Sequence, residues 1–259
     1  MVDTLRTSTF SRSALHDHAV EKGFYVAEDL AIEVDLTQAS KIQMAQLRDG
    51  IWDVVSTNFD NVLYWSEEHD SDLLVVSAME SLPRQDFVVR PEIKSYEDIR
   101  GTVIAVDAAE SGYVTPLRVL LETAGLKEVN DYTLTEFGAT DGRVAAMAEG
   151  KAVGAMVSEG RKLADGMWVM DAINRLYTHY ASIIVVRREW AEGNEALLLR
   201  YLRAHLGAAG SLKGSRDLSF AWDGLREMMQ MRSDVGFLRG DIDPTRFATE
   251  RYFEEARPR

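Results

Sequence analysis

Residues 22–36 read Lys-Gly-Phe-Tyr-Val-Ala-Glu-Asp-Leu-Ala-Ile-Glu-Val-Asp-Leu, and this stretch decides the expected fold. It follows a segment of helix length and passes through Gly23, a residue at which helices commonly end. It then closes with an alternation of apolar and acidic residues over 32–36, which predicts a strand. A further short apolar run follows Gly50. Strands that alternate with helices are typical of an α/β lobe.

The composition is that of a globular protein with an acidic surface. The chain has 259 residues, of which 46% are hydrophobic and 27% charged, and a net charge of −13. Nucleic acids and anionic membranes attract basic surfaces, so this charge argues against nucleic acid as a partner. The absence of cysteine excludes disulfides, thiolate nucleophiles and cysteine-ligated metal sites.

The sequence leaves the location of the protein open. No apolar run reaches the length that crosses a membrane, so we expect no membrane insertion. No signal-peptide pattern precedes the first expected strand. A periplasmic or extracellular location follows if a signal segment was removed, and a cytoplasmic one if Met1 is the native start.

Strand-like and helix-like segments alternate along the whole chain. Helical spacing of apolar residues predicts helices over 42–49, 116–124 and 197–205. The segments expected as strands are Leu5–Thr9, Ile32–Leu36, Val54–Thr57, Leu73–Ala78, Phe87–Arg90, Val103–Asp107, Tyr132–Phe137, Ala155–Val157 and Ser182–Arg187.

One arrangement occurs twice. Residues 45–50 form a helix end with a terminal glycine, and 51–54 begin a short buried strand. Residues 145–150 and 151–155 repeat that order. The repetition predicts two similar α/β lobes.

Several segments resemble one protein family. Residues 22–36 resemble the opening of the solute-binding proteins of bacterial ABC transporters, in the SsuA/THI5-like (NMT1-like) branch. Residues 87–101 resemble the passage into the second lobe of that family, where an I-K-S-x-x-D-L-x-G-K segment precedes a V-A-V strand, here 103–106. Residues 183–191 resemble the return to the first lobe, and the similarity covers about 5–206.

The resemblance implies an α/β, two-lobed periplasmic-binding-protein-like fold of type II. Each lobe would be a mixed sheet flanked by helices, and two crossing strands would form the hinge. Lobe one would comprise 1–90 plus 183–259, and lobe two 91–182. It also implies the function: the chain would close on a small organic ligand as the substrate-binding component of an ABC importer, with a permease as partner.

In such a fold the ligand cleft is lined by loops after strands and by helix N-termini, which favour anions. Four segments have this position: 9–13, 56–61, 107–116, and 157–160 together with 177–180. The expected ligand-binding residues are Phe10, Ser11, Arg12, His16, Asn58, Phe59, Asp60, Ser111, Gly112, Tyr113, Ser158, Glu159 and Tyr180. Some have structural alternatives, since a serine at 11 or 13, or Asp60, can simply cap a helix.

The residue types leave the ligand class open. Arg12 can hold a carboxylate or sulfonate, whereas Asp60 would repel an anion. The family usually carries a small-residue loop near 107–116, and this chain has Glu110 and Tyr113 there. This departure disfavours simple sulfate or sulfonate and favours an aromatic or heterocyclic ligand. A ligand that carries a carboxylate or sulfonate stays open.

The second hypothesis is a cytoplasmic enzyme on the same scaffold. Similar enzymes include aromatic decarboxylases, a sulfinate desulfinase and pyrimidine synthases. The last two depend on cysteine motifs that this chain lacks, so a cofactor-independent decarboxylase or hydrolase of an aromatic ring acid is the surviving version. The candidate catalytic groups are His16, His179 and Glu159. No nucleotide or metal-binding spacing occurs, so we expect no cofactor and no metal, and we favour binding over catalysis.

Overall fold

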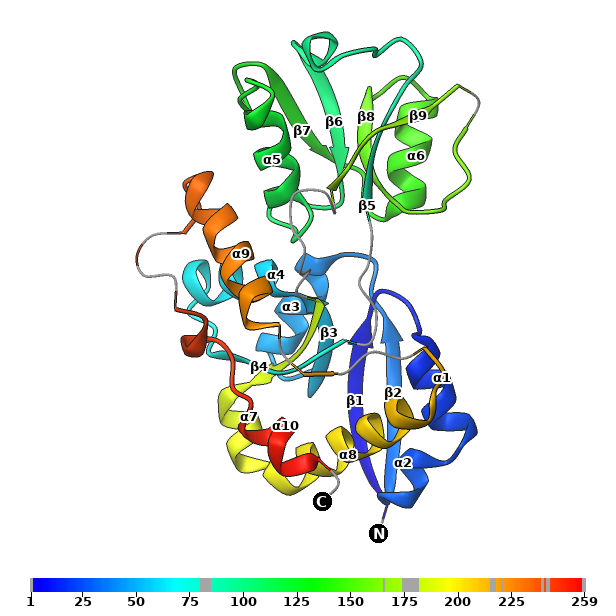
Figure 1. Ribbon diagram of the computed structural model, residues 1–259, viewed down its shortest axis with the longest axis vertical. Helices are drawn as coiled ribbons and strands as arrows, with labels where there is room; N and C mark the ends of the chain where they lie inside the picture. Colours follow the sequence, from blue (N-terminus) through cyan, green and yellow to red (C-terminus); the bar gives the residue numbers. More distant parts are fainter. Residues whose placement is uncertain are drawn as a thin grey trace.

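The computed structural model describes residues 2–79, 85–164, 166–173, 182–214, 218–219, 221–238, 240 and 243–257. They form two lobes, one above the other in Figure 1, and each is built on a five-stranded mixed sheet. The described N- and C-terminal ends of the chain both lie at the bottom of the first lobe (Figure 1). Among the helices within these ranges, none combines the length and apolarity needed to span a bilayer.

The first sheet has the strand order β2-β1-β3-β10-β4. Strands β1 and β2 pair in parallel, as do β1 and β3, whereas β10 is antiparallel to both of its neighbours. The strands are β1 (Asp3–Thr9), β2 (Leu30–Leu36), β3 (Val54–Asn58), β4 (Leu73–Ala78) and β10 (Ser182–Arg187). One face packs on α1 (Ala14–Glu21), α2 (Phe24–Ala27), α7 (Arg188–Gly193), α8 (Glu195–Ser211) and α10 (Arg251–Ala256). The other packs on α3 (Ser40–Arg48) and α4 (Phe59–Glu68).

The second sheet has the order β7-β6-β8-β5-β9 and is covered by one helix on each face. Its elements are β5 (Gln85–Val89), η1 (Tyr96–Ile99), β6 (Thr102–Val106), α5 (Val114–Thr123), β7 (Tyr132–Glu136), α6 (Thr140–Ala148), β8 (Gly154–Ser158) and β9 (Trp168–Ala172). The strand at 87–90, which the sequence analysis assigned to the first lobe, pairs with β8 and β9 of this second sheet. The residue limits of the lobes stay a prediction.

The apolar runs are fully buried because the sheets are covered on both faces. In β10, Ile183 and Val185 join one apolar cluster, while Ile184 and Val186 join the other. Successive side chains of a strand point to opposite faces. A strand with helices on both sides therefore reads as a continuous apolar run and not as an alternation.

The two lobes repeat one plan in detail. In each sheet one strand runs antiparallel to both of its neighbours, and its register shifts relative to one of them. The shift lies between Ile184 and Val185 in β10 and between Phe87 and Val88 in β5. An arginine stands at the end of each of these strands. Arg187 donates to the carbonyl of Leu47 at the end of α3, and Arg90 donates to that of Met147 at the end of α6. The repetition seen in the sequence is thus a structural repeat.

The glycines of the repeat close both helices. Gly50 follows α3 and Gly150 follows α6, with φ angles of 78° and 75°. This left-handed conformation disfavours residues with a Cβ atom, so both helices end where the sequence predicted.

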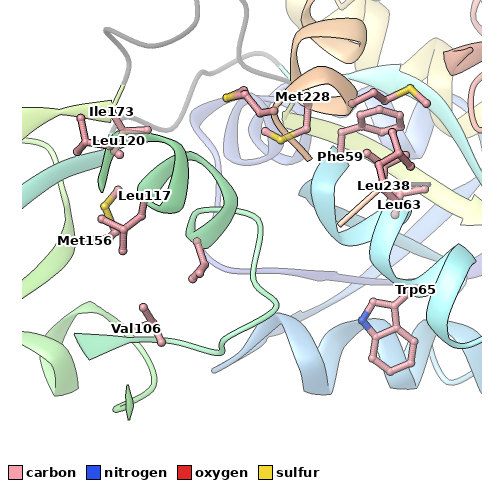
Figure 2. Packing of buried hydrophobic residues seen from close by; sticks show 14 of the residues in the cluster. Phe59, Leu63, Trp65, Val106, Leu117, Leu120, Met156, Ile173, Met228 and Leu238 are labelled. Atoms are coloured by element: carbon pink, nitrogen blue, oxygen red, sulfur yellow. The ribbon is translucent and has the colours of Figure 1, made fainter. Parts of the chain in front are cut away.

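Helix α9 (Trp222–Asp234) connects the lobes. It packs against α4 of the first lobe and α5 of the second, and Figure 1 shows it alongside both. Apolar residues of the three helices form one buried cluster that continues into both sheets. Figure 2 draws part of it, with Phe59 and Met228 on one side and Leu117 and Met156 on the other. The short η3 (Pro244–Arg246) follows α9 and contacts it.

The predicted α/β class and all nine predicted strands are confirmed, and no strand end differs from its predicted position by more than two residues. Strand β9, at an edge of the second sheet, was not predicted. The stretch 22–36 contains one feature beyond the predicted helix end and strand: a single helical turn, α2, between Gly23 and β2.

Candidate functional site

A cleft of about 800 Å³ lies between the lobes. Its walls come from the carboxyl ends of β1, β3 and β8 and from the loops that follow strands of both sheets. Strand ends and loops of this kind are the usual place for ligands in α/β sheets. The first lobe contributes residues at 9–14, 37–40, 56–61, Met79 and 212–214, and the second contributes residues at 107–113, 139–143, Gln85, Ser158 and Arg161.

Five helices begin at this cleft, because residues at the N-terminal ends of α1, α3, α4, α5 and α6 belong to its lining. Ser13 caps α1 and Asn58 caps α4 through their side-chain oxygens. Helices α3 and α6 have alanine at the N-cap and no side-chain cap. Uncapped N–H groups and the positive ends of helix dipoles favour an anion.

The lining of the cleft is basic, although the chain as a whole is acidic. Among the described residues, four cationic side chains line the cleft, Arg12, Arg143, Arg161 and Lys213, but only two carboxylates, Asp107 and Asp141. Asp141 pairs with Arg161, and Asp107 accepts a hydrogen bond from the Ser111 hydroxyl. On a chain with a net charge of −13, this cleft is a local positive region.

Arg143 is the most buried of these cations, with 5% of its surface exposed. Its Nε atom donates to the carbonyl of Met156 at 2.9 Å, and its Nη atoms donate to the Gly138 carbonyl at 2.7 Å and the Thr140 hydroxyl at 3.1 Å. All three acceptors are neutral. Burial lowers the pKa of Arg143, and the carboxylate of Asp107 opposes this effect.

The lobes touch across the cleft at Gly112. The Asn58 amide of the first lobe donates to the Gly112 carbonyl of the second at 3.4 Å. A Cβ atom on Gly112 would lie 2.5 Å from Cγ of Asn58, closer than any normal contact. Gly112 therefore allows the close approach of the two lobes at this point.

Eight of the predicted ligand-binding residues line the cleft: Phe10, Ser11, Arg12, Asn58, Ser111, Gly112, Tyr113 and Ser158. They come from three of the four predicted segments and part of the fourth. Whether each contacts the ligand stays a prediction.

The structure does not bring Phe59 and Asp60 into the cleft lining. Both side chains are fully buried, and Phe59, the first residue of α4, belongs to the apolar cluster that α4 shares with α5 and α9. Asp60 pairs with Arg232 of α9 at 3.0 Å. Burial raises the pKa of Asp60, although Arg232 acts in the opposite direction. Its carboxylate therefore does not disfavour an anion in the cleft, contrary to the expectation from the sequence.

His16 and Glu159 also lie outside the lining. The Nδ1 atom of His16 is 3.1 Å from the Tyr25 hydroxyl, which is 2.8 Å from Nε2 of the buried His205. Glu159 is exposed next to Ser158, and Glu110 of the 107–116 loop does not line the cleft either. The remaining predicted site residues, His179 and Tyr180, lie outside the described residues.

Sequence reasoning missed Thr140, Arg143, Arg161 and Lys213, which line the cleft. The first two follow β7 at the start of α6, a position that corresponds to Ser40 and Gln43 of α3. The repeat is the signal that indicates them, since its two helix starts occupy corresponding positions. Over the described residues, no three histidine or acidic side chains are grouped as a metal site would need.

Comparison with known proteins gives a family and a fold. The family model described as NMT1/THI5 like matches residues 18–212. No curated protein matches.

Three solved structures illustrate the fold. A protein of Bordetella bronchiseptica RB50 has 16% identity and a TM-score of 0.78, over 98% of this chain and 96% of that one. The alkanesulfonate-binding protein SsuA of Xanthomonas axonopodis pv. citri, bound to MOPS, has 16% identity and a TM-score of 0.68, over 98% and 84%. A cysteine-to-serine variant of DSZB in complex with biphenyl-2-sulfinic acid has 15% identity and a TM-score of 0.63, over 99% of both chains.

Proposed function

Because the chain belongs to the NMT1/THI5-like family, we propose that it is the substrate-binding component of an ABC importer and holds a small organic ligand between its lobes. The observation that carries this proposal is the cleft of about 800 Å³ with walls from both lobes. Clefts of 300–1,000 Å³ are typical of sites for organic molecules. The partner of the loaded protein would be a membrane permease.

The ligand class that fits is an organic anion with an apolar or aromatic body. The excess of cationic side chains and the five helix N-termini favour a carboxylate or sulfonate. The exposed ring of Phe10, together with Met79 and Leu212, offers apolar contact to the rest of the molecule. The Xanthomonas protein bound to the sulfonate buffer MOPS supports this class.

Binding would close the lobes on the ligand. The contact between Asn58 and Gly112 joins a first-lobe helix cap to a second-lobe loop at the edge of the cleft. Anion contacts from both lobes would stabilise this arrangement relative to an open one, since a ligand favours the state in which it makes more contacts.

The enzymatic hypothesis has no specific observation in its favour. Of its three candidate groups, His16 and Glu159 are absent from the cleft lining, and His179 lies outside the described residues. A decarboxylase or hydrolase of a ring acid would need acid–base groups other than His16 and Glu159 in this cleft.

A binding screen tests the proposal. Benzenesulfonate, benzoate, MOPS and the neutral compounds benzenesulfonamide and uracil are titrated into the protein by calorimetry and by thermal shift. We expect saturable binding of at least one anion and a rise in Tm. A folded sample that binds none of the panel would contradict the proposal.

Gly112→Ala tests closure with a matched control. The added methyl group collides with Asn58, so we expect a loss of affinity of about tenfold or more, from about 1.4 kcal/mol of lost closure energy. Gly210→Ala in α8 places the same methyl group in open space and should bind as the wild type does. Equal affinity of all three proteins would show that this contact has no part in binding.

A further inference from the structure

Comparison of the two repeats singles out one buried charge, on Arg143, that the corresponding position of the first lobe lacks. Helices α3 and α6 have equal length, as do the strands β3 and β8 that follow them, at an offset of 100 residues. Gln43 of α3 thus corresponds to Arg143 of α6, and Ser56 of β3 corresponds to Met156 of β8. Gln43 and Arg143 are both buried.

The two corresponding side chains make the same structural contact. Nε2 of Gln43 donates to the Ser56 carbonyl at 3.2 Å, and Nε of Arg143 donates to the Met156 carbonyl at 2.9 Å. Each nitrogen is bonded to Cδ of its side chain. A neutral amide is therefore sufficient to hydrogen-bond the helix to the strand that follows it. The guanidinium of Arg143 makes the same contact in the second lobe but adds a positive charge.

That charge is poorly compensated by the protein itself. Within the described part of the chain, Arg143 has no carboxylate at ion-pair distance, and three of its five N–H groups are bound to neutral oxygens. It also lies in the first turn of α6, whose dipole presents a second positive charge. A buried cation next to a helix N-terminus is unfavourable unless an anion occupies the adjacent space.

We infer that Arg143 selects the charge of the ligand: it binds the carboxylate or sulfonate of the organic anion in the cleft, together with the first turn of α6. This inference rests on the proposed function. The anionic group is then held by the second lobe, near Thr140 and Ser158, which line the same wall. The apolar body extends toward Phe10 and Met79 of the first lobe.

The decisive variant is Arg143→Gln, because the repeat shows that glutamine makes the strand contact. Benzenesulfonate and its neutral analogue benzenesulfonamide are the probes, with MOPS as a second sulfonate, and calorimetry gives Kd. Removing one partner of a buried charge pair weakens binding by about 30-fold or more. We expect that loss for the sulfonates, and a change of less than about threefold for the sulfonamide, which makes no charge pair.

Arg90→Gln is the matched control. Arg90 also donates to a carbonyl of α6, that of Met147, but it is ion-paired with Glu92 and does not line the cleft. This variant should bind the sulfonates as the wild type does and should melt at a lower temperature. Ligand-free Arg143→Gln loses the hydrogen bonds to Gly138 and Thr140 but also removes an uncompensated charge, so its Tm should fall less than that of Arg90→Gln.

The outcomes separate the two proposals. Sulfonate binding to Arg143→Gln at wild-type strength would overturn the inference alone, as would a fall in its ligand-free Tm as large as that of Arg90→Gln. Failure of the wild type to bind any probe would overturn the proposed function, and the inference with it.

Discussion

At the scale of single residues, a buried histidine makes the stability of this fold depend on pH. His205 is buried next to the Tyr25 hydroxyl, and among the described residues its Nδ1 atom has no hydrogen-bond partner. Burial lowers the pKa of His205 to about 3, with a smaller contribution from His16. The folded protein thus keeps this imidazole neutral at pH values where an unfolded chain would protonate it.

The sign of the resulting pH dependence follows from linkage. Above pH 6.5 the imidazole is neutral in both states and stability is complete. As the pH falls toward 3, only the unfolded chain binds the proton, so the free energy of unfolding decreases. Urea denaturation should show a loss of about 2 kcal/mol between pH 7 and pH 5 from this group. The variant His205→Gln should lack this part of the loss, and identical pH slopes for both proteins would refute the assignment.

The residue scale also explains what the sequence could not reveal. Asp60 stands directly after a strand, at a helix start, as a ligand-binding residue would. Its partner Arg232 is 172 positions away in the chain, in a helix whose packing no local pattern predicts. By contrast, the sequence predicts that Arg12 and Gly112 line the cleft, and they do. Their place depends only on the strand that precedes each of them in the chain.

At the scale of elements, burial decided which strands were predictable. Strand β4 is a run of buried apolar residues and was predicted at its observed limits. Strand β9 is an edge strand with one buried residue, Asp171, among partly exposed ones, and it lacks both the continuous run and the alternation. Its pairing is set by β5 and by the Tyr96 hydroxyl, which donates to Asp171 at 2.7 Å.

Helix α9 depends on a buried ion pair. Arg232 of this helix and Asp60 of α4 are almost completely buried, and the Thr115 hydroxyl of α5 also stabilises the charged carboxylate. Arg118 of α5 lies 4.6 Å from the ring of Phe237, just beyond α9. Three helices from both lobes thus meet at this pair.

Breaking one side of the pair should destabilise the protein. Asp60→Asn removes the charge that compensates the buried guanidinium, so we expect a loss of about 3–5 kcal/mol in the free energy of unfolding. The double variant Asp60→Leu/Arg232→Met replaces both charges by apolar groups and should recover most of that loss. Urea denaturation of the three proteins measures both effects, and a double variant weaker than Asp60→Asn would contradict this account.

At the scale of the whole molecule, the lobes share one core. The cluster around α4, α9 and α5 continues from Val55 and Val185 in the first sheet to Ile104 and Phe87 in the second. This cluster therefore connects the lobes through side-chain packing. A closing motion that keeps this cluster packed would therefore pivot at these helices.

A shared core predicts that both lobes unfold together. The calorimetric and van't Hoff enthalpies of the ligand-free protein should agree, which is the mark of a two-state transition. Trp168, in β9, is the only tryptophan of the second sheet, so in Trp168→Phe the fluorescence reports the first lobe and α9 alone. Circular dichroism of the same variant reports both lobes, and we expect equal midpoints from the two signals. Separate transitions would mean that the apolar cluster does not couple the lobes and that α9 moves with only one of them.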